Sequence, residues 1–205
     1  MVLVMTRSAS TPRLRLTQGF YAVMTLSSLV AGGAARPAAW STLLSLVSFL
    51  AVAAACLGRI WCSVFIAGRK DIALVTMGPY AWCRHPLYAW SLLAGFGLGL
   101  STQTWTWPIL AVGLLTWLFQ REMRREDQLL AERHGAAFLA YAARTPALWP
   151  RRPAATAPAV EISLRPDLFA KAFLDAGSML LVFALLTALT ALRQAGSLPT
   201  VLQIP

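Results

Sequence analysis

The chain has 205 residues, of which 58% are hydrophobic and 13% are charged, and its mean hydropathy is +0.61. Soluble domains of this length are much less apolar, so the composition indicates a protein of the lipid bilayer. The net charge of +10 would suit a nucleic-acid-binding protein, but the basic residues lie between apolar runs and form no single stripe. We therefore expect membrane lipids as partners, and no nucleic acid.

The first apolar run, 19–35, follows Arg7, Arg13 and Arg15 and ends in small residues, as the apolar part of a signal peptide would. Further apolar runs follow it, so a first membrane-spanning helix explains the same features, and this is the reading that we prefer.

Four segments approach or exceed the roughly 20 apolar residues that a spanning helix needs, namely 19–35, 38–67, 87–120 and 170–192. The third is long enough for two helices, and its middle holds a polar, aromatic stretch that ends in Pro108. We expect a hairpin of helices near 87–101 and 106–120. The predicted fold class is all-α, a polytopic membrane bundle of about five transmembrane helices.

Segment 38–67 is longer than one crossing requires, so its last turns should project into the interface. Arg59 would then reach the lipid headgroups, although a place in a polar cavity is the alternative. The cysteines, Cys56, Cys62 and Cys83, show no metal-ligand spacing, and we predict neither a disulfide nor a metal site.

Most basic residues fall before 19–35, around 69–84 and within 121–171, which a five-span topology places on one side. By the positive-inside rule that side is cytoplasmic, so the N-terminus is expected inside and the C-terminus outside. We divide the chain into a two-span region (1–71), a core (72–150), and a linker with the last helix (151–205).

The polar part of the core begins with a strong helix former, 120–134, which Gly135 interrupts. A second helical stretch, 136–143, places Phe138 and Tyr141 on one face. Prolines then end the helix, and 151–160 has the composition of a linker. We expect residues 121–150 to form a helical cap.

Two polar islands, 78–88 and 122–144, should meet at the cytoplasmic interface. Pro86 keeps His85 out of the helical region and begins the next helix, so this imidazole could hydrogen-bond a ligand. Anchoring of Arg84 and His85 among lipid phosphates is an equally good explanation.

The second island contains two adjacent acids, Glu126 and Asp127. Neighbouring helical residues point about 100° apart, so at most one acid is expected to face a pocket, and a solvated, ion-paired face remains the alternative.

In order and spacing these islands resemble the isoprenylcysteine carboxyl methyltransferases and related phospholipid methyltransferases of membranes. The family pattern is Gly-x-Tyr, Arg-His-Pro-x-Tyr, Glu-Glu-x-x-Leu, Phe-Gly-x-x-Tyr-x-x-Tyr and Arg-x-Pro. Its counterparts here are Gly78–Tyr80, Arg84–Tyr88, Glu126–Leu130, His134–Tyr141 and Arg144–Pro146. The resemblance covers about 72–150 and departs from the pattern at Asp127, His134 and Phe138. The missing phenol at position 138 puts the family substrate in doubt.

The resemblance implies a pocket for S-adenosylmethionine at the cytoplasmic face, with S-adenosylhomocysteine as the product. The residues that it assigns to this cofactor are Val75, Gly78, Tyr80, His85, Pro86, Leu87, Tyr88 and Glu126. A carboxylate can accept hydrogen bonds from ribose hydroxyls, and aromatic faces favour a sulfonium cation.

The acceptor that the resemblance implies is lipophilic or lipidated, either a prenylcysteine-like carboxylate or a phospholipid headgroup. Arg144 and Glu126 are the catalytic candidates, and Arg144, Arg121 and Tyr141 are the candidates for holding the acceptor. Arg144 could equally neutralise headgroups, since spare arginines near a membrane usually bind lipid.

Two other classes remain open. Membrane sterol reductases carry a similar Arg-His-Pro-x-Tyr motif and use NADPH, but they generally have more spans before it and an Asn where this chain has Leu87. A lipid-binding helical bundle without chemistry explains the composition but not the order of the motifs.

Overall fold

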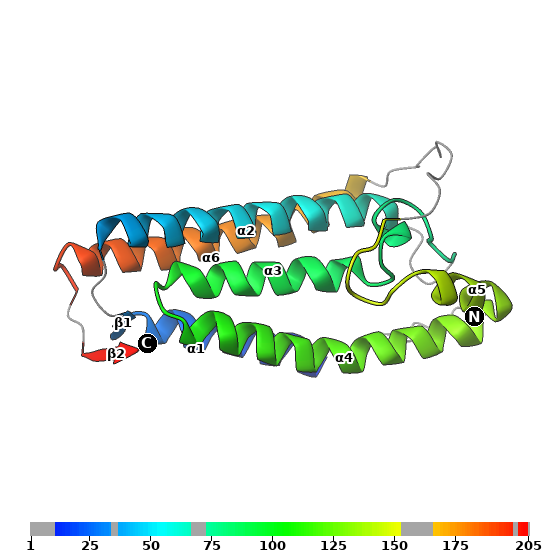
Figure 1. Ribbon diagram of the computed structural model, residues 1–205, viewed down its shortest axis with the longest axis horizontal. Helices are drawn as coiled ribbons and strands as arrows, with labels where there is room; N and C mark the ends of the chain where they lie inside the picture. The colour runs from blue at the N-terminus through cyan, green and yellow to red at the C-terminus, as the bar shows by residue number, and fades with distance from the viewer. Residues whose placement is uncertain (1–10, 34–36, 67–72, 153–165, 199–200, 205) are drawn as a thin grey trace.

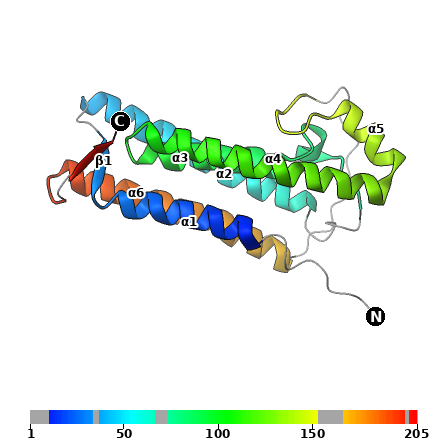
Figure 2. The same ribbon diagram turned by 90° about the horizontal axis from the view of Figure 1, so that it is seen from below.

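Six α-helices form an elongated bundle in the computed structural model, which describes residues 11–33, 37–66, 73–152, 166–198 and 201–204 (Figures 1 and 2). The helices are α1 Thr11–Ser27, α2 Ala38–Ile66, α3 Pro86–Ser101, α4 Thr106–His134, α5 Ala136–Arg144 and α6 Pro166–Gln194. A 3₁₀ turn, η1 (Gly78–Ala81), precedes α3, and strands β1 (Ala31–Gly33) and β2 (Leu202–Ile204) pair at one end. The predicted helical fold class is confirmed in this part of the chain.

Among the described residues, two helices are long and apolar enough to cross a membrane, namely α2 and residues Phe169–Gln194 of α6. Both carry large apolar side chains on the outside of the bundle, such as Leu57 and Leu181, which are 69% and 74% exposed. Apolar surface on this scale is typical of a protein in contact with lipid. The two helices and the composition indicate a membrane protein, while the count of five spans stays a prediction.

Helix α3 lies in the middle of the bundle, against α2, α4 and α6. Its glycines allow the close approach: a Cβ at Gly97 would stand 2.8 Å from Val52 Cγ2, and one at Gly99 would stand 2.4 Å from the backbone nitrogen of Pro108. Ser48 on α2 donates a hydrogen bond to the Gly97 carbonyl at 2.7 Å. Small residues at helix contacts are a common way to pack helices in membranes.

The predicted hairpin is confirmed, because α3 ends at Ser101 and α4 begins at Thr106. The predicted boundary near residue 120 is wrong, since α4 continues to His134 as one helix of 29 residues. From residue 114 to 134 there is neither glycine nor proline, so nothing in the backbone ends the helix where the apolar part gives way to the charged part. The acid pair therefore stands on the same rigid helix as the hairpin.

The first helix is shifted towards the N-terminus relative to the predicted run 19–35, because α1 begins at Thr11 and ends at Ser27. Residues Ala31–Gly33 instead form β1, which pairs in parallel with β2 (Ala31 opposite Leu202). A Cβ at Gly33 would stand 2.2 Å from the Gln103 carbonyl oxygen, so the small residues are needed for close packing. Such residues have little strand propensity, which explains why the sequence did not indicate a strand.

The second helical stretch of the cap is confirmed as α5, and Gly135 separates it from α4 with a φ of +51°. Residues 153–160 of the predicted linker lie outside the described residues. The same holds for Arg7, Arg69 and Lys70, on which the topology prediction partly depended.

Candidate active site

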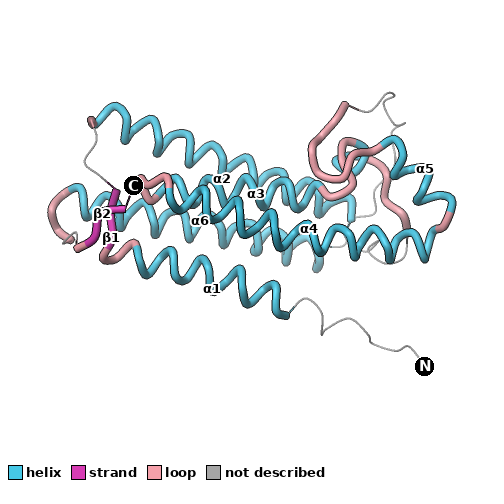
Figure 3. The backbone as a smooth tube through the Cα atoms, turned by 60° about the horizontal axis from the view of Figure 1, so that its bottom comes forward, coloured by secondary structure: helices cyan, strands magenta, loops and turns pink. Residues whose placement is uncertain are grey.

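The two polar islands meet at the end of the bundle that carries α5, as predicted (Figure 3). The chain after α5 folds back against the loop before α3 through backbone hydrogen bonds. The N–H of Arg84 donates to the Pro146 carbonyl at 2.9 Å, and the N–H of His85 donates to the Ala147 carbonyl at 3.0 Å. The Arg-x-Pro motif thus fixes the position of the Arg-His-Pro motif.

His85 lies between the two adjacent acids of α4. Its Nε2 is 2.9 Å from Asp127 Oδ1, and its Nδ1 is 3.5 Å from Glu126 Oε2. The side chain is 3% exposed and caps α3, which Pro86 begins. The prediction that at most one acid would face the pocket is wrong, because the two nitrogens on different sides of one ring let both carboxylates reach the imidazole.

Asp127 also binds Arg84, whose Nη2 is 3.0 Å from Oδ2. The Arg84 guanidinium lies 6.0 Å from the centroid of the buried Phe138 ring and 3.5 Å from the Ala142 carbonyl oxygen. Sequence reasoning assigned neither Arg84 nor Asp127 to the site. Both residues are sequence neighbours of predicted site residues, Arg84 of His85 and Asp127 of Glu126, and this adjacency could have indicated them. For Asp127, the argument about helical angles led to the opposite conclusion.

Glu126 is held more loosely than Asp127. The Tyr88 hydroxyl donates to Glu126 Oε2 at 3.4 Å, at the long end of the hydrogen-bonding range. The Glu126 side chain is 37% exposed, against 25% for Asp127. Tyr88 packs on Phe119 with ring centroids 4.7 Å apart. Asp127 is thus placed to orient His85 and Arg84, whereas Glu126 is placed to accept hydrogen bonds from a ligand.

Tyr80 and Tyr141 join η1 to α5. The Tyr141 hydroxyl donates to the Tyr80 carbonyl at 2.6 Å, and the Tyr141 side chain is buried. The Tyr80 hydroxyl is itself buried and has no hydrogen-bond partner within the described residues. Burial, with the nearby Cys62 and Glu126, raises the pKa of Tyr80, so this group is a neutral donor. An unpaired buried hydroxyl costs free energy that a polar ligand atom would recover.

The remaining predicted site residues are spread over the same end of the molecule. Gly78 begins η1 with a φ of +59°, and a Cβ there would stand 2.4 Å from the Phe65 ring. Val75 and Leu87 are half-buried. Arg144 is exposed at the end of α5, and Arg121 lies over the Trp117 ring at 4.2 Å. The arginine that pairs with the acid pair is therefore Arg84, while roles for Arg121 and Arg144 stay predictions.

The stability provided by His85 should depend on pH. Burial lowers the pKa of His85, but the hydrogen bonds and charges of Asp127 and Glu126 outweigh it and raise the pKa above its ordinary 6.5. The folded state therefore binds this proton more tightly, and the resulting stability is complete below 6.5 and is lost as the pH rises through the raised value. The destabilisation caused by His85→Gln should be larger at about pH 6 than at about pH 9 in denaturant unfolding. Equal destabilisation at both values would contradict a charged imidazole.

Within the described residues, no group of three or more His, Cys, Asp or Glu side chains is placed to hold a metal ion. Cys56, Cys62 and Cys83 are free and buried.

Comparison with known proteins finds a family model that covers the first three of the five motifs, Gly78–Tyr80, Arg84–Tyr88 and Glu126–Leu130. Residues 39–132 match the model of the isoprenylcysteine carboxyl methyltransferase (ICMT) family. The cobalt-zinc-cadmium resistance protein CzcN of Cupriavidus metallidurans is 40% identical over 127 residues, which are 62% of this chain and 58% of that protein. The nickel-cobalt-cadmium resistance protein NccN of Alcaligenes xylosoxydans xylosoxydans is 39% identical over 127 residues, 62% of this chain and 59% of that protein.

The chain thus spans somewhat under three fifths of the length of these relatives. No solved structure matches it. The matched segment contains α2, α3 and most of α4, and with them His85, Tyr88 and both acids. The segment that resembles the isoprenylcysteine carboxyl methyltransferase family is therefore the one that carries these four residues.

Proposed function

We propose that this protein is an integral membrane methyltransferase that uses S-adenosylmethionine and methylates a lipophilic acceptor, the carboxylate of a prenylcysteine-like compound. The observation that carries the proposal is the meeting of His85, Tyr88 and Glu126 at one end of an apolar bundle, although about 40 residues separate their motifs in the sequence. The proposal includes further crossings by α1, α3 and the apolar half of α4, with this end in the cytoplasm.

The residues present fit the cofactor. Glu126 can accept hydrogen bonds from the ribose hydroxyls, and the Tyr80 hydroxyl offers a buried donor. The half-buried ring of Tyr88 would favour a sulfonium cation. Bound S-adenosylmethionine supplies an activated methyl group. The protein then has to orient the acceptor and exclude water, and Asp127 helps by holding a proton on His85 Nε2 and fixing the ring.

The surroundings of His85 favour a carboxylate acceptor over a headgroup amine. A carboxylate is ionised at neutral pH and can attack the methyl group directly to form an ester. A protonated amine must first lose a proton to a base. Both ring nitrogens of His85 already lie against carboxylates, Nε2 against Asp127 and Nδ1 against Glu126, so this imidazole is not placed to take a proton from an amine.

The test is a calorimetric titration of S-adenosylhomocysteine, and separately of NADPH, into the full chain in detergent. Saturable binding of S-adenosylhomocysteine alone is expected. Labelled methyl transfer from S-adenosylmethionine to N-acetyl-S-farnesylcysteine or to phosphatidylethanolamine then identifies the acceptor. Binding of NADPH alone would instead indicate a membrane reductase. Binding of neither ligand would support a lipid-binding helical bundle without enzymatic activity.

The names of the two relatives concern resistance to metal cations. We extend this to the chain as a cellular setting, in which the methylated acceptor is a membrane component that affects metal tolerance. Cells that carry an inactive, normally expressed variant should then lose tolerance, and unchanged tolerance would argue against this setting.

A further inference from the structure

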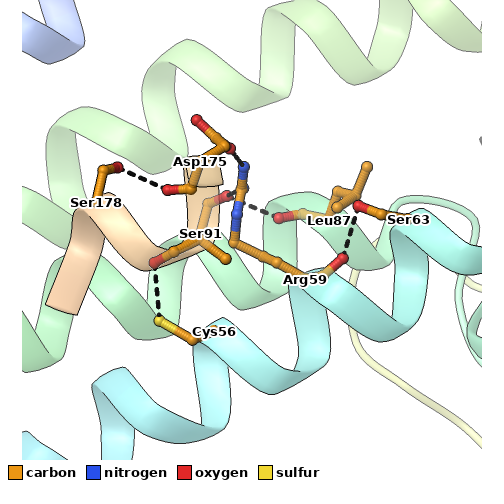
Figure 4. Close-up of polar contacts among 8 residues, drawn as sticks. Cys56, Arg59, Ser63, Leu87, Ser91, Asp175 and Ser178 are labelled. Carbon is orange, nitrogen blue, oxygen red and sulfur yellow. Dashed lines mark hydrogen bonds and ion pairs between the residues drawn. The ribbon is translucent and has the colours of Figure 1, made fainter. Parts of the chain in front are cut away.

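A second polar cluster lies inside the apolar bundle, where Arg59 of α2 contacts both α3 and α6 (Figure 4). Arg59 Nη1 donates to Ser91 Oγ at 2.6 Å, and Nη2 pairs with Asp175. Arg59 and Asp175 belong to the two helices that are able to span a membrane. Side chains of two neighbouring helices thus hold the Arg59 guanidinium, while its depth relative to the headgroups stays a prediction.

The two charges of this pair differ in exposure. The Arg59 side chain is 20% exposed, whereas that of Asp175 is 60% exposed. Cys56 donates to the Ala176 carbonyl at 3.2 Å, so α2 and α6 touch one turn away, and Asp175 lies at the outer edge of this contact. Charged residues within spanning helices are costly and usually functional. Here the cation is largely buried, and its counterion is the more exposed partner of the pair.

The hydrogen bonds of Arg59 leave room for a further acceptor. A guanidinium has five N–H donors. Arg59 Nε is buried and has no partner within the described residues. A planar guanidinium binds carboxylate and phosphate oxygens through two parallel hydrogen bonds, so an incoming oxyanion could engage Nε and Nη2 together if Asp175 moved aside.

The cluster adjoins the candidate active site. Ser91 follows Tyr88 by three residues and donates to the Leu87 carbonyl at 2.7 Å. Residues three apart share a helix face and differ by about 4.5 Å along the axis. The Arg59 guanidinium is therefore about one helical turn deeper in the bundle than the Tyr88 and Glu126 pair.

We propose that Arg59 binds the oxyanion of a lipophilic acceptor that enters between α2 and α6, and that Asp175 occupies Arg59 until the acceptor displaces it. Lys171 is exposed one turn before Asp175 on the same face of α6, and it adds a second cation at the mouth of this path. The ligand class is an anionic amphiphile with a carboxylate or phosphate. That this ligand is the methyl acceptor rests on the proposed function.

The experiment measures equilibrium binding of two fluorescent probes, a farnesylated cysteine with a free carboxylate and a phospholipid, to the full chain in detergent. Arg59→Gln should weaken binding of the preferred probe by about tenfold or more, as for loss of a charged hydrogen bond, and Arg59→Lys should weaken it less. Asp175→Asn should tighten binding by about threefold, because it removes the competing carboxylate. Affinity for S-adenosylhomocysteine should stay unchanged in all three.

Arg193→Gln is the matched control. Arg193 lies in α6 like Asp175, and its buried Nε has no partner within the described residues. It donates to the carbonyl of Ser28, just after α1, at the far end of the bundle. The Arg193→Gln variant should have a lower melting temperature than the wild type but the same affinity for both probes. If Arg59→Gln and Asp175→Asn lowered the melting temperature alone, the pair would be a structural tie and the proposal wrong.

Weaker probe binding in Arg144→Gln but not in Arg59→Gln would also overturn the proposal, by moving the oxyanion site to α5. Probe binding needs no turnover, so it tests the role of Arg59 independently of methyl transfer. A wild-type protein that neither bound S-adenosylhomocysteine nor transferred methyl would contradict the proposed function but not the oxyanion site at Arg59.

Discussion

Glu126→Gln is expected to weaken binding of S-adenosylhomocysteine by about 10- to 100-fold and to leave the protein folded. The carboxylate is 37% exposed and lies 3.5 Å from His85 Nδ1 and 3.4 Å from the Tyr88 hydroxyl, so the isosteric amide should be accommodated without a change of fold. An amide keeps the shape and one acceptor oxygen but lacks the charge that strengthens hydrogen bonds from ribose hydroxyls. Titration calorimetry measures the affinity, and thermal unfolding in detergent checks the fold.

The matched control is Glu132→Gln, which changes an exposed acid on the same helix, α4. It should leave the affinity as in the wild type. If Glu126→Gln bound S-adenosylhomocysteine as well as Glu132→Gln did, Glu126 would not hold the cofactor, and Asp127 or Tyr80 would become the leading candidate.

Asp127→Ala is expected to destabilise the protein by about 3 kcal/mol. Asp127 is the shared partner of His85 Nε2 and Arg84 Nη2, which belong to side chains that are 3% and 17% exposed. Removal of the carboxylate leaves both groups partly or fully buried without their charged acceptor, and such orphaned groups cost more than a lost surface ion pair. Denaturant unfolding at pH 7 measures the change.

The pH dependence offers an independent check of this assignment. Asp127 provides one of the hydrogen bonds that raise the pKa of His85, so stability of Asp127→Ala should vary less between about pH 6 and about pH 9 than that of the wild type. Glu132→Ala serves as the control, and a substitution at such an exposed site typically changes stability by about 0.5 kcal/mol or less. A cost for Asp127→Ala no greater than that of Glu132→Ala would mean that the cluster is not a structural unit.

Features that depend on neighbours in the chain were predicted correctly. Proline at position 86 begins α3 and holds His85 at its cap, and Gly135 separates α4 from α5. The hairpin of α3 and α4 was evident because polar and aromatic residues interrupt an apolar run. These signals are local: a fixed proline φ, a glycine that permits positive φ, and apolar runs of helical length act on the backbone wherever the helices finally pack.

Contacts between side chains that are distant in the sequence were harder to predict from the sequence. Motif order indicated that His85 and Glu126 belong to one site, but not that Asp127 would bind His85 and Arg84 together. The angle of about 100° between adjacent helical residues describes the directions in which Glu126 and Asp127 leave α4. It does not prevent both carboxylates from reaching the His85 ring, because the ring has a nitrogen on each of two sides.

The sequence by itself therefore determined the apolar character of the chain, most of its helices and the family motif that links His85, Tyr88 and Glu126. Only the tertiary structure decided that α4 carries the acid pair without a break, that β1 pairs with β2, and that Arg59 meets Asp175 across 116 residues. The physical reason is that backbone preference acts over a few residues, whereas the partner of a buried charge depends on which helices approach closely enough to shield it from lipid.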